Sequence, residues 1–335
     1  MKKNLKRTIC LLLSLALALS LFGCAKKEAE PAPEEPAAAA PVTVNVMTLN
    51  GTTGFGMAGL MHDAAAGSAA QSYNFSVETD ASNITAALIS GSVDIAALPT
   101  NAASVVGNKT NGAVQALALN TRGVLYLVSD GYEKIMDMSS LAGKTVFAPA
   151  QNPSFIMEYL CKAYELTDSV TIDNTYAQPA ELTKALAAGQ IHLAVLPEPM
   201  VSMAMAQNEN LQVVLDLTAL WDQVAPEGSL VQGCVVVRKA FAQEHPDQVA
   251  LFLEEYEASI ALCADDPEKA ADDIVECGIF TNRDVALKAL PQCNLCFVTG
   301  QEMKTSLSKY LELMAQVNAQ SVGGQVPSDD FYYIP

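Results

Sequence analysis

The feature that most constrains the fold is an internal repeat. Residues 87–99 read ALISGSVDIAALP and residues 185–197 read ALAAGQIHLAVLP, with the same offset of 98 positions throughout. In each copy a helix is expected to end at a glycine, Gly91 or Gly189, because glycine accepts the left-handed conformation that closes a helix. A buried strand follows, and a proline then stops the strand before a new helix. The shared register favours duplication over chance similarity, so the repeat predicts one α/β lobe used twice, each with parallel strands.

The segments ahead of each copy support the duplication. Residues 42–49 alternate in polarity and are rich in valine, which predicts a strand that breaks at the loop 50–54 (NGTTG). In the second half, the strand expected over residues 145–148 also breaks at a polar loop. Asn152 is expected to be the N-cap of the next helix, with Pro153 at its first position.

Two apolar segments are expected to join the lobes. Residues 114–128 form a long apolar run with a polar interruption at 120–123, and residues 233–237 return the chain. The predicted fold is therefore α/β, with two Rossmann-like lobes joined by two crossover strands. Lobe 1 is expected to comprise residues 43–125 and 235–335, and lobe 2 residues 126–234.

The N-terminus predicts an address outside the cytosol. Four basic residues among the first seven precede an apolar run over residues 9–21, and the sequence LFGC at 21–24 ends it. This pattern is typical of a secretory signal, and the run is shorter than the ~20 apolar residues that a spanning helix needs. We expect a signal peptide at residues 1–23.

The Leu-x-Gly-Cys ending also resembles the lipobox of bacterial lipoproteins. The resemblance implies cleavage before Cys24, a lipid on its sulfur, and a location on the outer face of the cytoplasmic membrane or in the periplasm. The alternative is a plain signal peptide with an incidental cysteine. Residues 25–41 are almost entirely Ala, Pro, Glu and Lys. This composition predicts a flexible tether over residues 24–42.

Charge and composition exclude several functions. The net charge of −18 leaves no basic stripe to neutralise phosphates, so no nucleic-acid partner is expected. Cys293 and Cys296 have redox-motif spacing but lie in a strand-like run, which favours buried, structural cysteines. The three histidines lie far apart and near no cysteine cluster, so no metal site is predicted. No catalytic grouping can be assembled, and we expect neither an enzyme nor a cofactor.

The chain resembles the type II periplasmic binding proteins in segments of both halves. The matching segments are GSVDIA at 91–96, LAGKTV at 141–146, GQI at 189–191 and VVVR at 235–238. The chain is most similar to the branch that includes the nitrate, sulfonate, taurine and thiamine-pyrimidine-precursor binders. The resemblance implies a monomer that closes two lobes on a small-molecule ligand and delivers it to the permease of an ABC importer. A surface ligand sensor, a sulfonate- or nitrate-type anion binder and an enzyme on this fold stay open as alternatives.

Ligands of open α/β sheets lie beyond the carboxyl ends of the strands, near helix N-termini. The residues that we expect to bind ligand are Asn50, Gly51, Thr52, Thr53, Gly54, Phe55, Thr100, Asn101, Asn120, Asn152, Ser154, Gln178, Glu198 and Trp221. For each Thr, Asn and Ser, the alternative role is a helix cap that does not contact ligand. This set is rich in amides and hydroxyls, which favours a neutral polar or nitrogen-heterocyclic ligand with Glu198 accepting an N–H. For Arg122, the one cation near the expected cleft, a salt bridge is favoured over a ligand contact.

Overall fold

The structure is a computed structural model that describes residues 42–334. The predicted signal peptide, Cys24 and all of the predicted tether except Val42 lie outside the described residues. Within residues 42–334, no helix combines the length and the apolar character that crossing a membrane requires.

The first sheet is built from both ends of the described chain. Its strands are β1 (Thr43–Leu49), β2 (Ser72–Glu78), β3 (Ile95–Pro99), β4 (Val114–Arg122), β10 (Val231–Arg238) and β11 (Leu295–Thr299), in the order β11-β4-β10-β3-β1-β2. β1 pairs in parallel with β2 and β3, whereas β10 is antiparallel to β3 and β4. This sheet and its helices are called lobe 1 below.

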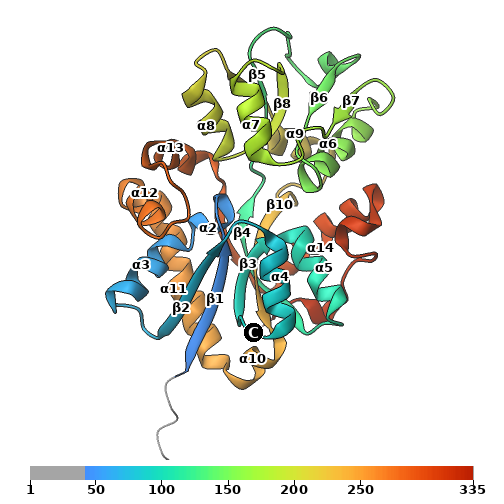
Figure 1. Cartoon of the computed structure of the whole chain (residues 1–335). Coiled ribbons are helices and arrows are strands. Elements are labelled where there is room, and N and C mark those ends of the chain that lie inside the picture. Colours follow the sequence, from blue (N-terminus) through green and yellow to red (C-terminus); the bar gives the residue numbers. More distant parts are fainter. Residues whose placement is uncertain (1–41, 335) are drawn as a thin grey trace, which may run out of the picture. The chain divides into compact units, whose positions relative to one another are not determined.

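The second sheet comes from the middle of the chain. Its strands are β5 (Leu125–Ser129), β6 (Thr145–Phe147), β7 (Thr171–Asp173), β8 (Leu193–Pro197) and β9 (Gln212–Asp216), in the order β7-β6-β8-β5-β9. β6 is parallel to β7 and β8, whereas β5 is antiparallel to β8 and β9. This sheet and its helices are called lobe 2, and Figure 1 shows helices flanking both sheets.

Helices fill the connections within each lobe. Lobe 1 carries α2 (Thr52–Phe55), α3 (Ala58–Ala66), α4 (Ala81–Ser90), α5 (Thr100–Lys109), α10 (Lys239–Glu244), α11 (Pro246–Asp265), α12 (Pro267–Glu276), α13 (Arg283–Ala289) and α14 (Gly300–Val317). Lobe 2 carries α6 (Asn152–Ala163), α7 (Pro179–Ala187), α8 (Met200–Gln207) and α9 (Leu217–Val224). Short 3-10 helices lie at Met138–Leu141, Leu290–Gln292, Ala319–Val322 and Asp329–Phe331.

The two copies of the repeat occupy equivalent places in the two lobes. α4 ends at Gly91 with φ of 77°, and Gly189 follows α7 with φ of 69°, as the repeat predicts. β3 and β8 then enter the two sheets, buried along all but their last residue. The predicted α/β fold is confirmed by the two sheets and their helices.

The sheets differ from the predicted parallel units, because the first contains two antiparallel strands, β10 and β11, and the second contains one, β5. β5 arrives in lobe 2 directly from lobe 1, and β10 arrives in lobe 1 directly from lobe 2. Each arriving strand enters its sheet from the side where the parallel strands have their carboxyl ends. It therefore runs opposite to them, and both sheets are mixed.

The chain crosses between the sheets at two short segments. Residues 123–124 link β4 to β5, and residues 225–230 link α9 to β10. The return strand β10 starts at Val231 in the first sheet, ahead of the predicted entry at residue 235. The polar Gln232 interrupts the apolar pattern, but its side-chain oxygen accepts a hydrogen bond from the Val124 backbone N–H at 2.7 Å. Pairing with β3 and β4 places residues 231–234 in lobe 1.

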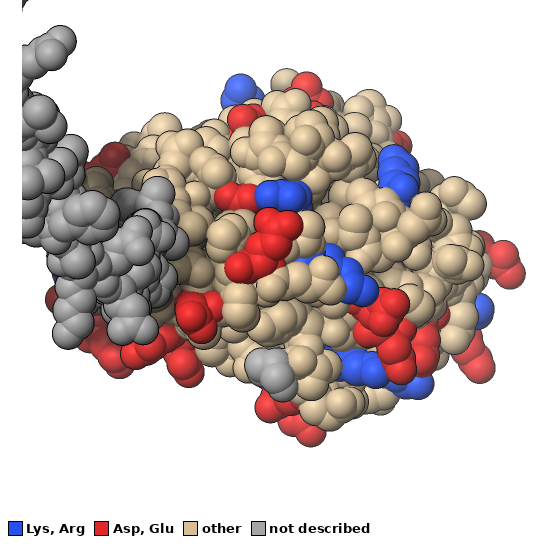
Figure 2. Space-filling view, turned by 90° about the horizontal axis from the view of Figure 1, so that it is seen from below, with Lys and Arg blue, Asp and Glu red and all other residues tan. Residues whose placement is uncertain are grey.

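The described cysteines are free thiols rather than disulfides. Cys293 is buried and Cys296 is half-buried, and burial raises the pKa of the Cys296 thiol to about 11. On the molecular face in Figure 2, acidic and basic side chains are interspersed rather than gathered into a basic stripe.

Candidate functional site

A cavity of about 470 Å³ lies where the crossing strands enter the two sheets. Its size falls in the range of roughly 300–1,000 Å³ that is typical of small-molecule sites. The lining residues of lobe 1 are Asn50, Gly51, Thr52, Thr53, Thr79, Pro99, Thr121, Gln232 and Phe280. Those of the crossing and lobe 2 are Val124, Leu125, Asn152, Pro153, Gln178, Pro179, Ala180, Pro197, Glu198, Pro199 and Met200. Both lobes therefore contribute walls to one cavity.

The loop after β1 forms the lobe 1 wall. Gly51 has φ of 78°, a left-handed conformation that side chains disfavour, and it precedes the short helix α2. Thr52 is buried, and its hydroxyl donates to the backbone carbonyl of Glu198 at 2.5 Å. This hydrogen bond joins the predicted glycine-threonine loop of lobe 1 to the strand end of lobe 2.

Glu198 carries the ionisable side chain of the cavity. It follows β8, is 4% exposed, and accepts hydrogen bonds from the Ser202 backbone N–H at 3.1 Å and the Ser202 hydroxyl at 3.0 Å. Burial raises the pKa of the Glu198 carboxyl, and the two bonds from Ser202 partly offset this effect. Among the described residues that line the cavity, Glu198 is the one acidic residue, and none is Lys, Arg or His.

Amides and apolar surfaces make up the rest of the walls. The Gln232 oxygen is occupied by the Val124 N–H, which leaves its amide nitrogen free to donate. Phe280 supplies an aromatic surface whose ring packs edge-on against Phe55 at 5.9 Å between centroids. Met200 and several prolines add apolar area. Such walls suit a small, mostly apolar molecule with a few polar groups.

Asn152 reaches the cavity at the start of α6. It does not act as the predicted N-cap, because Gln151 takes that position with φ of 70° and no side-chain cap hydrogen bond forms. The Asn152 side chain instead contacts the hydroxyl of Tyr310, which lies on α14 of lobe 1. This contact competes with capping and places the amide between the two lobes.

Three of the predicted residues near the first loop lie behind the cavity wall. A Cβ atom on Gly54 would lie 2.2 Å from the carbonyl oxygen of Leu49, so this glycine permits close packing of the loop. Phe55 is fully buried in the core. The Asn120 amide donates to the Tyr256 hydroxyl at 3.0 Å. Sequence reasoning found the loop but not the direction of these side chains.

Four more of the predicted residues have structural hydrogen bonds instead of cavity positions. The hydroxyl of Thr100 donates to the Val231 carbonyl at 2.8 Å, and that of Ser154 donates to the Pro149 carbonyl at 2.8 Å. Asn101 donates to the Ser321 carbonyl at 3.1 Å, and the Trp221 indole donates to the Ser229 hydroxyl at 2.9 Å. All four residues are buried, and none lines the cavity.

The predicted residues that do line the cavity are Asn50, Gly51, Thr52, Thr53, Asn152, Gln178 and Glu198. The sequence analysis missed Thr79, Thr121, Gln232, Phe280 and Met200. A signal for Gln232 was present, because a polar residue stands in an otherwise apolar strand. Thr79 directly follows β2, so the strand-end rule would also have found it.

Arg122 lies outside the cavity lining. Its guanidinium donates to the Gly228 carbonyl at 2.9 Å and lies 3.8 Å from a Glu302 carboxylate oxygen. The hydrogen bond to Gly228 links the two crossing segments. The contact with Glu302 is the salt bridge that the sequence analysis favours.

Three solved structures are similar to this chain along most of their length. An ABC transporter protein from Parabacteroides distasonis has a TM-score of 0.74 and 22% identity, over 88% of this chain and 98% of that one. The periplasmic aliphatic sulphonate binding protein SsuA from Escherichia coli has a TM-score of 0.69 and 13% identity, over 88% and 93%. The alkanesulfonate-binding protein SsuA from Xanthomonas axonopodis pv. citri, bound to MOPS, has a TM-score of 0.65 and 12% identity, over 89% and 100%. These likenesses confirm the periplasmic binding protein fold.

No curated protein matches the chain significantly. The family model described as NMT1/THI5 like matches residues 74–270, which is more than half of the chain and includes parts of both lobes. The chain therefore belongs to the NMT1/THI5-like family.

Proposed function

We propose that this protein is a solute-binding protein rather than an enzyme, and that it captures a small nitrogen-heterocyclic or neutral polar molecule between its lobes. The observation that carries the proposal is Glu198, the one acidic residue among the described cavity residues, buried between both lobes. A buried carboxylate needs hydrogen-bond donors, and a ligand with N–H groups supplies them. Phe280 offers a flat apolar surface for a heterocycle.

The cavity argues against the anion-binding alternative. Sulfonate or nitrate binding requires donors or cations that offset a negative charge, and the carboxylate of Glu198 opposes one. The described cavity residues include no Lys, Arg or His. The two SsuA proteins described above are named as sulfonate-binding proteins. The ligand screen must therefore include sulfonates.

The proposed role in the cell is capture outside the cytosol and delivery to the permease of an ABC importer. Support comes from the fold shared with ABC transporter components and from the secretory pattern of residues 1–23. We further propose that the protein is a monomer held to the membrane by a lipid on Cys24. A neighbouring permease gene would support import, and a neighbouring sensor kinase gene would favour sensing.

Thermal-shift screening of the full chain tests the ligand class. The panel contains pyrimidines and other vitamin-precursor heterocycles, alkanesulfonates, nitrate and amino acids. We expect a nitrogen heterocycle to raise Tm, and Glu198→Gln to weaken its binding about 10- to 100-fold, because a charge-assisted hydrogen bond is worth ~1.5–3 kcal/mol.

The control is Glu257→Gln, which changes an exposed glutamate on α11 that does not line the cavity. It should leave binding unchanged. A rise in Tm with sulfonates or nitrate alone, or full binding by Glu198→Ala, would show that the proposed ligand class is wrong.

A further inference from the structure

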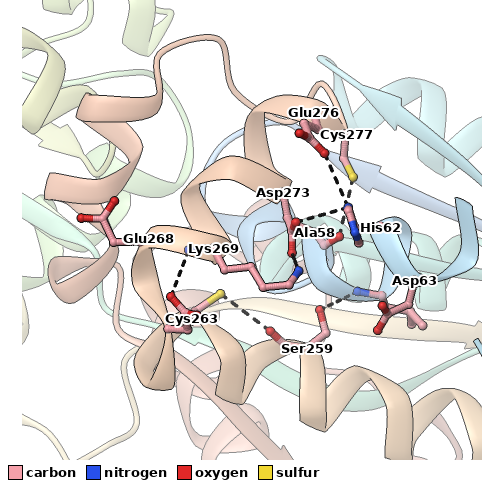
Figure 3. A network of polar contacts seen from close by, with 12 residues as sticks. Ala58, His62, Asp63, Ser259, Cys263, Glu268, Lys269, Asp273, Glu276 and Cys277 are labelled. Atoms are coloured by element: carbon pink, nitrogen blue, oxygen red, sulfur yellow. Dashed lines mark hydrogen bonds and ion pairs between the residues drawn. The ribbon is translucent and has the colours of Figure 1, made fainter. Parts of the chain in front are cut away.

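A group of metal-ligating side chains lies in lobe 1, outside the cavity. His62 on α3 faces Asp273 and Glu276 on α12, and their ligand atoms all lie within 4.8 Å of one another. The sequence analysis predicts no metal site because the histidines stand alone in the chain. The fold brings α3 and α12 together, so residues more than two hundred positions apart converge (Figure 3).

The separations suit a shared metal ion better than direct hydrogen bonds. His62 Nδ1 lies 3.3 Å from an Asp273 oxygen and 3.6 Å from a Glu276 oxygen. N–H···O hydrogen bonds measure about 2.7–3.2 Å. In a tetrahedral zinc site with bonds of about 2.0–2.1 Å, neighbouring ligand atoms lie roughly 3.3 Å apart. The two distances from His62 are therefore close to the ligand spacing of such a site.

Asp273 is held in position for such a role. Its side chain is 3% exposed, and one carboxylate oxygen lies 2.6 Å from the Lys269 ammonium. The other oxygen faces His62. Partners that orient a ligating carboxylate are typical of metal sites. In contrast, the Glu276 side chain is 66% exposed and that of His62 is 38% exposed, so water can reach the group.

We propose that His62, Asp273 and Glu276 bind a zinc-class divalent ion, with water at the remaining position. The imidazole nitrogen favours zinc over magnesium or calcium, which prefer oxygen ligands throughout. The ion would connect α3 to the end of α12. Three residues after Glu276, the Ile279 carbonyl accepts a hydrogen bond from the Gly51 N–H, and Phe280 then lines the cavity. The ion would therefore stabilise the lobe 1 wall.

Calorimetric titration of the metal-free, reduced full chain with zinc chloride tests the proposal. We expect one site with micromolar affinity and no binding of magnesium at the same concentrations. Glu276→Gln should weaken zinc binding at least 10-fold, and His62→Gln should abolish binding at this site. Saturating zinc should raise Tm of the wild type by about 5 °C and leave that of His62→Gln unchanged.

His192→Gln is the matched control. His192 also pairs with a carboxylate, Asp130 at 2.6 Å, but this pair lies in lobe 2 and has no third ligand among residues 42–334. The control should bind zinc like the wild type. Because Glu276 is exposed, Glu276→Gln should fold normally, which metal-free Tm values will check.

Cobalt substitution separates this site from the free thiols. We expect visible d–d absorption without a thiolate-to-cobalt charge-transfer band, since the ligands are nitrogen and oxygen atoms. The proposal would be overturned if the wild type did not bind zinc, or if Glu276→Gln and His62→Gln bound zinc with the affinity of the wild type. A thiolate-to-cobalt band that persists in His62→Gln would also overturn it.

Discussion

Glu198 is the residue on which the ligand chemistry depends. A carboxylate follows the β8 strand in the second copy of the repeat, whereas Thr100 follows β3 in the first. Thr100 is buried and bonded to the backbone, while Glu198 faces the cavity. The two equivalent positions therefore have different roles, and the duplication supplies the scaffold rather than the chemistry.

Burial of Glu198 predicts a pH-dependent cost to stability. The raised pKa means that the folded protein holds this proton more tightly than the unfolded chain does. The free energy of unfolding therefore falls as pH rises from the ordinary carboxyl pKa of 4.5 through the raised value. Relative to wild type, Glu198→Gln should gain roughly 2–4 °C in Tm between pH 4 and pH 7.

Thermal unfolding of both proteins at the two pH values measures this trend. The exposed substitution Glu257→Gln should stay within about 1 °C of wild type at both pH values. A Tm difference between wild type and Glu198→Gln that is the same at both pH values would contradict the assigned cause, desolvation of the carboxyl group.

At the scale of elements, the helix α14 joins the lobes. It is a helix of lobe 1, yet it packs against α6 of lobe 2. The Tyr310 hydroxyl donates to the Asn101 oxygen at 2.9 Å and contacts the cavity residue Asn152. The Tyr310 ring also lies 5.9 Å from Trp221 of lobe 2, between centroids. A buried phenol thus connects both lobes beside the cavity.

Tyr310→Phe should therefore lower stability by about 1–2 kcal/mol, because the amide oxygens of buried Asn101 and half-buried Asn152 lose a hydrogen-bond partner. Ligand affinity should also fall, since Asn152 loses a contact that positions it. Denaturant unfolding and calorimetric titration measure the two effects.

Tyr332→Phe is the control. The Tyr332 hydroxyl is buried without a hydrogen-bond partner in the part of the chain that the structure describes, so its removal should cost nothing or stabilise the fold slightly. Equal effects of the two substitutions would contradict the role assigned to the Tyr310 hydroxyl.

Elements were easier to predict than side-chain directions. Alternation and glycine stops located β1, β3 and β8 within two residues of their ends, because burial and helix termination leave local patterns. The antiparallel course of β5 and β10 has no local pattern, since it follows from where the chain crosses. Phe280 could not be predicted, because its place in the cavity depends on the packing of α12 and α3.

At the scale of the whole molecule, two crossing segments make the cavity a property of both lobes. The Glu198 backbone N–H donates to the Val124 carbonyl at 3.0 Å, so the charged residue is attached to the crossing itself. The Thr52 hydroxyl reaches the Glu198 carbonyl from the other lobe. A molecule bound at Glu198 would contact both lobes, which is the condition for ligand binding to favour a closed arrangement.

A crystal structure of the protein with the heterocycle selected by the screen tests the central claim most directly. We predict a ligand N–H about 2.8–3.0 Å from a Glu198 carboxylate oxygen, with further contacts from Gln232 of lobe 1 and Asn152 of lobe 2. A ligand bound outside this cavity, or held by one lobe without contact to Glu198, would contradict the account.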